Sequence, residues 1–447
     1  MPLRLVLVRH GLSSFNREQR IQGRDDLSSL TDEGAEQARA VGRSLAELPF
    51  DAAYTSPLSR AHDTAGLVLG EQRQPPGLNS HDDLLEIDLA PWTGLLRSEL
   101  RERFPEQERL WREAPHTLEL QRADGQAYRP LPELMNQAVR FRDTLLQQHR
   151  AALEGPGQSS VLVVAHNGIL RCLLLALLGL EASGFRRLRL ENASISVLNL
   201  SAGPGDRPAV QLESLNGTTH LAPSLPRRVA GPRLLLVRHG ETDWNREGRF
   251  QGQIDIPLNT NGRAQADAAR RFLAAIPIDR AYTCAMARPR QTAESILLEH
   301  PGVPLTSTTG LVEIGHGLWE GRLEQEIAEG WPQLLADWKE RPHTVQMPQG
   351  ETIHDVWQRS LDTWNRIASG LDPRETALVV AHDAVNKTIL CGLLGLGADA
   401  IWTIKQGNGG VTVIDYPDGA EGEPVVTCMN LTGHLGGVLD RTAAGAL

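Results

Sequence analysis

The chain contains one sequence pattern twice, and this repeat constrains its architecture more than any other feature. The stretch LVLVRHG at residues 5–11 recurs as LLLVRHG at residues 234–240, an offset of 229. The apolar run that ends at His166 recurs before His382 at an offset of 216, and the tail that contains His220 recurs around His434 at an offset of 214. Self-similarity of this kind indicates duplicated structural units. We therefore predict two tandem domains of one fold.

The spacing of the repeated motifs also predicts the domain boundaries. The offset is nearly constant from His10 to Glu86 and then falls by 11 before His166, which places one length change in a single segment. Residues 222–232 read APSLPRRVAGP, with three prolines and no periodicity, as is typical of a linker. We predict domain 1 at residues 1–221, a linker at 222–232 and domain 2 at 233–447. A chain of 447 residues can bury two cores of about 100–200 residues each.

Strand and helix patterns alternate within each copy. Unbroken apolar runs at residues 5–8, 161–165 and 378–381 are typical of parallel strands buried on both faces. Helical spacing follows, and Thr31 is a predicted helix N-cap. The predicted buried stripes are Ala35, Ala38, Val41, Leu45 and Leu48 in the first copy and Ala264, Ala268, Phe272 and Ile276 in the second. These patterns predict α/β domains with mostly parallel central sheets.

Charge and cysteine content narrow the class of partners. The formal net charge is −10, and the chain has no long run of Lys or Arg, so we expect neither a nucleic-acid nor a membrane partner. The four cysteines are far apart and form no C-x-x-C pair, which favours a reducing, cytoplasmic setting. We see no signal peptide, and the apolar run at Leu173–Leu178 is far shorter than the about 20 residues of a membrane span.

The histidines at strand ends suggest a phosphate site. Ligands of open parallel sheets collect at the carboxyl ends of the strands, where His10 and His166 follow two strands of the first copy. We expect these two side chains to face one crevice, as we expect for His239 and His382. Arg9 and Arg238 stand beside the first histidines, and the arginine fork of donors matches phosphate oxygens.

Further motifs in each copy carry a family resemblance. The second copy contains LVRHGETDWN, then Phe250-Gln251-Gly252, Pro257 to Gly262, Ala287-Arg288 to Ala293, Glu313 to Gly321, and Val380-Ala381-His382. The first copy contains Arg9-His10-Gly11, Asn16, Gln22-Gly23, Thr31, Gly34, Ser56 to Ala61, Thr64-Ala65, Glu86, Trp92, Gly94 and His166. In this order, both copies resemble the histidine phosphatase superfamily, which includes the phosphoglycerate mutases. The resemblance implies two phosphoglycerate mutase-like domains with three α/β/α layers.

The resemblance also implies roles for these residues. His10 and His239 would attack phosphorus and form phosphohistidine. The equatorial oxygens would be stabilised by Arg9, Arg60 and His166 in one copy and by Arg238, Arg288 and His382 in the other. Glu86 and Glu313 would protonate the leaving oxygen and then activate water. The implied substrate-binding residues are Gly11, Asn16, Gln22, Gly23, Gly240, Glu241, Thr242, Asn245, Gln251 and Gly252. We predict no metal and no other cofactor, because the cations are arginines and neither H-E-x-x-H nor an aspartate-rich cluster is present.

Each copy departs from the family pattern at one place near the nucleophile. Leu12 and Ser13 replace the usual Glu-Thr that Glu241 and Thr242 retain. Asp383 follows His382 where the family usually has glycine, and its carboxylate would repel phosphate unless it points away. Substrate contacts are therefore expected to differ between the copies.

The predicted function is hydrolysis of small phosphate monoesters such as sugar phosphates or phosphoglycerates. One alternative is a phosphoglycerate mutase, but the residues around Glu313 resemble the phosphatase branch, and mutases exclude water from the site. A second alternative is that one copy, more readily the first, is a noncatalytic phosphate sensor or scaffold. The sequence names neither the substrate nor the oligomeric state.

Overall fold

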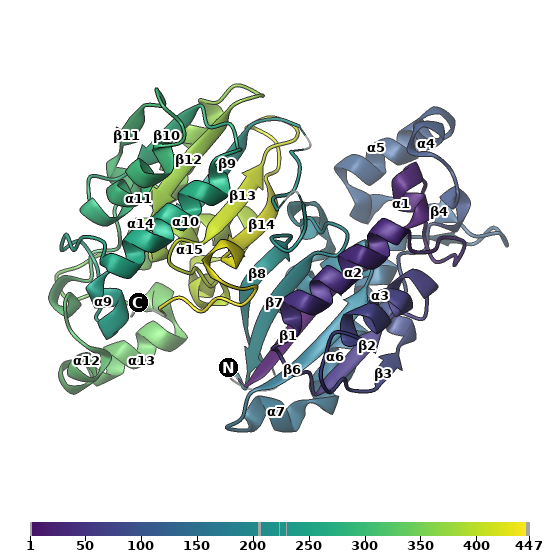
Figure 1. Ribbon diagram of the computed structural model, residues 1–447, viewed down its shortest axis with the longest axis horizontal. Coiled ribbons are helices and arrows are strands. Elements are labelled where there is room, and N and C mark those ends of the chain that lie inside the picture. Colours follow the sequence, from purple (N-terminus) through teal and green to yellow (C-terminus); the bar gives the residue numbers. More distant parts are fainter. Residues whose placement is uncertain (1, 204–206, 223, 229, 444–447) are drawn as a thin grey trace. The chain divides into compact units, whose positions relative to one another are not determined.

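The structure is a computed structural model that describes residues 2–203, 207–222, 224–228 and 230–443 (Figure 1). Its contacts divide the chain into unit 1, Met1–Pro226, and unit 2, Arg227–Leu447. Each unit is a three-layer α/β/α domain, as the sequence predicts. Among the helices of the described residues, none is both long and apolar enough to cross a membrane.

The sheet of unit 1 is mostly parallel and has the order β8-β7-β1-β6-β2-β3. Its strands are β1 (Leu3–Arg9), β2 (Ala52–Thr55), β3 (Leu78–Ser80), β6 (Ser159–Ala165), β7 (Ile195–Ser201) and β8 (Ala209–Gly217). Strands β1, β6, β2 and β3 pair in parallel, whereas β7 pairs antiparallel with both β1 and β8. The central pair keeps Arg9 opposite Ala165, so the residues after β1 and β6 emerge at the same sheet edge.

The sheet of unit 2 repeats this topology with the order β11-β10-β12-β9-β13-β14. Its strands are β9 (Arg233–Arg238), β10 (Arg280–Thr283), β11 (Leu305–Ser307), β12 (Thr376–Ala381), β13 (Val411–Asp415) and β14 (Val425–Leu431). Arg238 lies opposite Ala381 in the parallel β9–β12 pair, and β13 pairs antiparallel with β9. The sheet edge that follows β9 and β12 therefore corresponds to the edge that follows β1 and β6.

Helices cover both faces of each sheet (Figure 1). Unit 1 contains α1 (Ser14–Glu18), α2 (Asp32–Leu45), α3 (Ser59–Leu69), α4 (Arg97–Arg103), α5 (Pro105–Glu113), α6 (Pro130–Gln148), α7 (Arg150–Glu154) and α8 (Asn167–Leu178). Unit 2 contains α9 (Asp243–Glu247), α10 (Thr260–Leu273), α11 (Ala287–Leu297), α12 (Glu324–Gly330), α13 (Pro332–Glu340), α14 (Ile353–Ser369) and α15 (Asp383–Leu394). Helix α2 packs with α3 and α6 with α8, and the pairs α10–α11 and α14–α15 repeat this arrangement.

The two equivalent helices α2 and α10 test the predicted buried stripes. Thr31 caps α2, where its side chain accepts from the Gly34 amide at 3.0 Å, and the predicted Ala38, Val41 and Leu45 are buried. The other two predicted residues, Ala35 and Leu48, are only half-buried, and Leu48 lies beyond the end of α2. The stripe predicted for α10 is wrong, because the buried residues there are Gly262, Gln265, Ala266, Ala269 and Leu273. The buried Gly262, Ala266, Ala269 and Leu273 match the buried residues of α2 at a constant offset of 228, so the small and apolar residues of the equivalent side pack inward, and the predicted residues do not lie on that side.

The longer segment of unit 1 between Glu86 and His166 adds a small two-stranded ladder. Its strands are β4 (Leu120–Gln121) and β5 (Ala127–Tyr128), paired antiparallel. Arg122 beside the ladder bonds Glu133 at the start of α6 and Asp88, both at 2.7 Å. The insertion is therefore held next to the segment that carries Glu86.

Candidate active sites

Each unit brings its two strand-end histidines together. The amide of His10 donates to Ala165 O at 3.0 Å, and the amide of His239 donates to Ala381 O at the same distance, so both backbones are tied to the neighbouring strand. The ring centroids of His10 and His166 lie 5.2 Å apart, and those of His239 and His382 lie 5.1 Å apart. All four side chains are buried.

The first histidine of each pair has a defined proton position. Nδ1 of His10 lies 2.8 Å from Gly11 O, and Nδ1 of His239 lies 2.7 Å from Gly240 O. A carbonyl oxygen can only accept, so Nδ1 carries the hydrogen and Nε2 keeps its lone pair. Burial, with the neighbouring arginines as a second cause, holds the pKa of both histidines well below its usual value. Neutral imidazole with a free Nε2 is the form required of a nucleophile.

The predicted arginines point their guanidinium groups into the same sites. In unit 2, Arg288 Nε donates to His239 Nε2 at 3.3 Å, and its Nη2 donates to Gly252 O at 2.8 Å. In unit 1, Arg60 Nη2 donates to Gly23 O at 3.0 Å, and Arg9 Nη1 donates to Leu190 O at 2.7 Å. Burial lowers the pKa of Arg9 and of Arg288 to about 10, which leaves both charged at neutral pH.

Several of these guanidinium groups keep a donor free. The Nε atoms of Arg9, Arg60 and Arg238 are buried and have no hydrogen-bond partner among the described residues. A buried donor without a partner costs free energy, and such groups are frequent where a ligand completes the site. Phosphate oxygens are the acceptors that an arginine fork matches best.

The loop after each nucleophile is built in the same way in both units. The Gly11 amide donates to Thr64 Oγ1 at 3.1 Å, and the Gly240 amide donates to Thr292 Oγ1 at 3.1 Å. Each glycine is required because another part of the backbone lies close to it. A Cβ on Gly11 would lie 2.2 Å from Gly34 O, and a Cβ on Gly240 would lie 2.3 Å from Gly262 O. The backbone next to His10 and next to His239 is thereby fixed in the same way in both units.

The predicted phosphate-binding amides lie next to this loop. Ser13 Oγ donates to Asn16 Oδ1 at 2.9 Å and to Gln22 Oε1 at 3.1 Å. Thr242 Oγ1 makes the equivalent contacts with Asn245 Oδ1 at 3.1 Å and Gln251 Oε1 at 2.7 Å. Because the amide oxygens accept these hydrogen bonds, the amide nitrogens remain as donors for a ligand. Gln251 Nε2 is buried without a partner among the described residues.

The carboxylate of Glu241 is occupied by three side chains of its own unit. Its oxygens accept from Arg246 at 2.7 Å, from Asn259 at 2.8 Å and from Asn261 at 3.1 Å. Leu12 has no such groups to offer, so the loop support that Glu241 supplies in unit 2 is missing at that position in unit 1.

The two predicted acids occupy different positions. Glu86 Oε2 accepts from the Gly168 amide at 3.1 Å, and Oε1 accepts from the amides of Ile169 at 3.2 Å and Ile87 at 2.9 Å. Glu313 accepts from the Ile314 amide at 3.0 Å and from the Asp383 amide at 3.1 Å. Burial, followed by the negative charge of Asp383, raises the pKa of Glu313. A raised pKa suits a group that must hold a proton before it donates it.

The sequence predicts that the Asp383 carboxylate would repel phosphate unless it points away from the site. In the structure it does not point away. Its Oδ1 lies 3.5 Å from Arg238 Nη1, and its Oδ2 lies 2.8 Å from Lys387 Nζ, with all three side chains buried. The repulsion is offset because two cations share this carboxylate. Lys387 also lies over the Trp402 ring, 4.8 Å from its centroid.

Four contacts at the sites, two in each unit, were missed in the sequence. His166 Nε2 lies 2.8 Å from Ser56 Oγ, and His382 Nε2 lies 3.2 Å from Cys284 Sγ. Asn192 Nδ2 donates to His10 O at 3.0 Å, and Asn408 Nδ2 donates to His239 O at 3.2 Å. The signal was available for the asparagines, because residues 192 and 408 have the same offset of 216 as the second histidines. In the described part of the chain, no group of three or more His, Cys, Asp or Glu side chains is arranged to hold a metal ion.

Comparison with known proteins identifies the family. The model of the histidine phosphatase superfamily (branch 1) matches twice, at residues 5–210 and 234–431. A 2-carboxy-D-arabinitol-1-phosphatase of Triticum aestivum is 31% identical over 97% of this chain and 86% of its own length. Phosphoserine phosphatase 1 of Hydrogenobacter thermophilus is 31% identical over 46% of this chain and 94% of its own length. Among solved structures, Bacillus stearothermophilus YhfR is 33% identical, with a TM-score of 0.40, over 42% of this chain and 93% of that one.

The chain therefore belongs to the histidine phosphatase superfamily and carries two copies of its domain. The relative that matches most of the chain is a phosphatase, and the relatives that match one copy include a phosphoserine phosphatase as well as phosphoglycerate mutases. The predicted class of enzyme, a phosphatase acting on small phosphate esters, is confirmed.

Proposed function

We propose that both units are working phosphatase sites and that each uses its own phosphohistidine intermediate. The observation that carries this proposal is the histidine pair in each unit, with Nδ1 of His10 and His239 donating to a carbonyl, so that Nε2 carries no hydrogen and keeps its lone pair. The same geometry in both copies argues against a purely structural role for unit 1.

In the first step, Nε2 of His239 attacks phosphorus and the bond from phosphorus to the ester oxygen breaks. Arg238, Arg288 and His382 surround the transferring group and stabilise its equatorial oxygens. The leaving oxygen takes the proton of the Glu313 carboxyl. His10, Arg9, Arg60, His166 and Glu86 perform these tasks in unit 1.

In the second step, water replaces histidine on phosphorus. The Glu313 carboxylate takes a proton from the attacking water, a new oxygen–phosphorus bond forms, and the nitrogen–phosphorus bond breaks. Inorganic phosphate leaves and His239 returns to its neutral form. Each proton that the glutamate gives in the first step is thus recovered in the second.

The substrate class we propose is a phosphorylated sugar or sugar acid, with 2-carboxy-D-arabinitol 1-phosphate as the first compound to test. The relative named for that activity matches this chain across both copies, whereas the phosphoserine phosphatase matches only one. We propose that specificity lies in the segments between Glu86 and His166 and between Glu313 and His382, which differ in length between the copies.

We propose a cytoplasmic setting and a phosphate ester as the ligand, with neither a nucleic-acid nor a membrane partner. The four cysteines, Cys172, Cys284, Cys391 and Cys428, are all buried, and none of them forms a disulfide within the described residues, which suits a reducing compartment. The proposed linker at residues 222–232 joins the two working domains.

The test is phosphate release from 2-carboxy-D-arabinitol 1-phosphate, sugar phosphates, phosphoserine, phosphoglycerates and p-nitrophenyl phosphate. The intact protein is compared with His10→Ala, His239→Ala and the double variant. His62→Ala and His354→Ala serve as controls, because these histidines are exposed on α3 and α14.

Each nucleophile variant should lose its own set of substrates by at least about 10³-fold. Unchanged turnover of every substrate in His10→Ala would make unit 1 a sensor or scaffold. Full activity of the double variant would contradict the phosphohistidine mechanism.

A further inference from the structure

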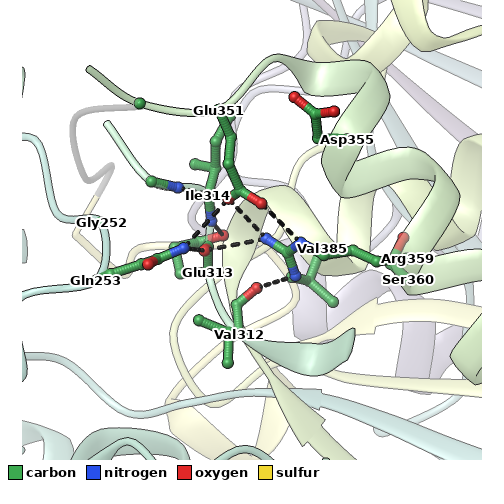
Figure 2. Close-up of polar contacts among 12 residues, drawn as sticks. Gly252, Gln253, Val312, Glu313, Ile314, Glu351, Asp355, Arg359, Ser360 and Val385 are labelled. Atoms are coloured by element: carbon green, nitrogen blue, oxygen red, sulfur yellow. Dashed lines mark hydrogen bonds and ion pairs between the residues drawn. The ribbon is translucent and has the colours of Figure 1, made fainter. Parts of the chain in front are cut away.

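One arginine of helix α14 holds the segment that carries Glu313. The Arg359 guanidinium donates to the backbone carbonyls of Gly310 at 3.2 Å, of Val312, and of Glu313 at 3.1 Å (Figure 2). These carbonyls belong to the short 3-10 turn Thr309–Leu311, to the residue that follows it, and to the acid residue itself. Arg359 therefore fixes the backbone of the acid residue and does not contact its carboxyl.

A second side chain reaches the same carbonyl from the loop after the nucleophile. Gln253 Nε2 donates to Glu313 O at 3.1 Å and to Glu351 Oε2 at 3.2 Å. Glu351 accepts Nε and Nη2 of Arg359, each at 3.0 Å, as well as the Gly315 amide at 2.8 Å (Figure 2). The Glu313 carbonyl thus has two donors from distant parts of the chain, and Glu351 offsets the charge of the guanidinium.

Unit 1 holds its acid with the same two functional groups in exchanged positions. Gln137 of α6 donates through Nε2 to Asp83 O at 3.1 Å and to Leu85 O at 2.7 Å. Arg24 Nε donates to Glu86 O at 3.0 Å, and Arg24 Nη2 donates to Gln137 Oε1 at 2.7 Å.

The numbering confirms that these positions correspond. Residues 24 and 253 are 229 apart, as are His10 and His239. The bonded carbonyls of residues 83, 85 and 86 correspond to those of 310, 312 and 313 at the constant offset of 227. Where unit 1 has arginine in the loop and glutamine on the helix, unit 2 has glutamine in the loop and arginine on the helix.

The exchange has a physical explanation. The carbonyls before each acid face inward and must be given donors, whichever element supplies them. An amide and a guanidinium can both donate to a carbonyl, and one of each fills the space, whereas two guanidinium groups would place like charges side by side. Two amides would offer enough N–H groups for three carbonyls, but in unit 2 they would leave Glu351 without the guanidinium that it bonds. A proton donor must be held in place closely, since a displacement of about 1 Å costs on the order of 10²-fold in rate.

We propose that Gln253 and Arg359 in unit 2, and Arg24 and Gln137 in unit 1, form an interchangeable two-residue brace that positions the catalytic acid. The inference rests on the proposed role of Glu313 and Glu86 as acids. Gln253, Arg359, Arg24 and Gln137 are positioning residues that act through the glutamate backbone. The identity of each member matters only in combination with the other.

The test exchanges the two side chains in unit 2. Gln253→Arg, Arg359→Gln and the double variant are made in the full chain with His10→Ala, so that unit 2 is measured alone. Two substrates separate positioning from general damage: β-glycerol phosphate, whose alkoxide leaves only when protonated, and p-nitrophenyl phosphate, whose leaving group needs little help from an acid. The rate constant kcat, KM and the thermal midpoint are measured for each protein.

Arg359→Gln should lower kcat for β-glycerol phosphate by about 10–100-fold and for p-nitrophenyl phosphate by less than about threefold, because an acid contributes roughly 10²–10⁴-fold to its reaction. The double variant should recover at least about tenfold of that loss, as expected for coupled neighbours. A double variant that loses the product of the two single losses would overturn the brace, as would equal losses on both substrates in variants that melt normally.

Two further variants keep the proposal testable if Arg359→Gln does not fold. Gln253 is exposed, so Gln253→Ala should fold and show the same dependence on the leaving group, with a smaller loss of kcat. Equal losses of kcat on both substrates would overturn the proposal. Glu313→Gln separates this inference from the proposed function. If Glu313→Gln shows the leaving-group dependence and the brace variants do not, the brace alone fails, and if Glu313→Gln lacks it, the acid assignment fails as well.

Discussion

In unit 1 the carboxyl of Glu86 lies against the amides of Gly168 and Ile169, inside the first turn of α8. In unit 2 the carboxyl of Glu313 accepts from the amide of Asp383, the first residue of α15, and so lies nearer the start of its helix. One methyl group accounts for the difference, because a Cβ on Gly168 would lie 2.4 Å from Glu86 Oε1, and residue 384 of unit 2 is alanine. Small changes at a helix N-terminus can therefore move a catalytic carboxyl without altering the fold.

The charge around the two acids differs as well. Unit 2 places Asp383 between Arg238 and Lys387, whereas the corresponding residue of unit 1 is the neutral Asn167. The same fold thus offers one site with an internal carboxylate and one without. We expect the two sites to differ in their response to pH and to anionic ligands.

The largest expected effect comes from removing the acids themselves. Glu313→Gln in a His10→Ala background, and Glu86→Gln in a His239→Ala background, should each lower kcat for alkyl phosphates by about 10²–10⁴-fold, since the leaving oxygen loses its proton donor. Phosphate release measured with alkyl and aryl esters checks this. A loss below about fivefold in either unit would show that the glutamate of that unit is not the acid.

The position of the Glu86 carboxyl can be tested with one methyl group. Gly168→Ala should push this carboxyl off the helix amides and lower the alkyl phosphatase activity of unit 1 by about tenfold, which corresponds to roughly 1.4 kcal/mol. Ala384→Gly is the matched variant in unit 2. It should leave the rate within about threefold and cost about 0.5–1 kcal/mol of stability, because glycine weakens a helix. Unchanged kinetics in Gly168→Ala would mean that the difference between the two positions has no catalytic consequence.

Asp383→Asn should shift the pH dependence of unit 2. Burial and the Asp383 charge raise the pKa of Glu313, and the proton donor is active only while protonated. The rate therefore falls as pH rises through this raised pKa. Removing the charge lowers that pKa, so the alkaline limb of the kcat profile should move to lower pH, by about one unit for roughly 1.4 kcal/mol of lost interaction. A profile that does not move would contradict the coupling.

The same variant should also change anion binding. Arg238 and Lys387 lose their shared carboxylate, so inorganic phosphate should inhibit unit 2 about tenfold more tightly. The free protein should melt at a lower temperature, because a buried Lys387 without its partner is costly. Asn167→Asp in unit 1 is the reciprocal variant and should weaken phosphate inhibition there. If neither Asp383→Asn nor Asn167→Asp changes the inhibition by phosphate relative to its parent protein, the charge at this position does not reach the phosphate.

The smallest effect is expected at the side chain that contacts the second histidine. Cys284→Ser in unit 2 and Ser56→Cys in unit 1 exchange the groups that lie beside Nε2 of His382 and His166. Both residues can donate or accept one hydrogen bond, so kcat should change by less than about threefold. A larger change in one direction only would mean that the orientation of the second histidine depends on the atom beside it.

The repeat, the strand-end histidines and the arginines could all be predicted because each depends on local sequence. A buried strand followed by Arg-His-Gly specifies where the nucleophile emerges, whatever the rest of the chain does. The α/β class followed for the same reason, since unbroken apolar strands that alternate with amphipathic helices have few ways to bury their surfaces. The buried side of α10 was mispredicted because several alanines recur at helical spacing on more than one side of this helix, and only packing shows which of them are buried.

Only the tertiary structure decided the contacts between side chains that are distant in sequence. Arg24 and Gln137 are 113 residues apart, and Gln253 reaches Glu351 across 98 residues, so no local pattern pairs them. The direction of Asp383 was equally hidden, because it depends on Arg238 at the end of β9 as well as on Lys387 of its own helix. Sequence determines which groups stand at the sheet edge, and packing determines which of them meet.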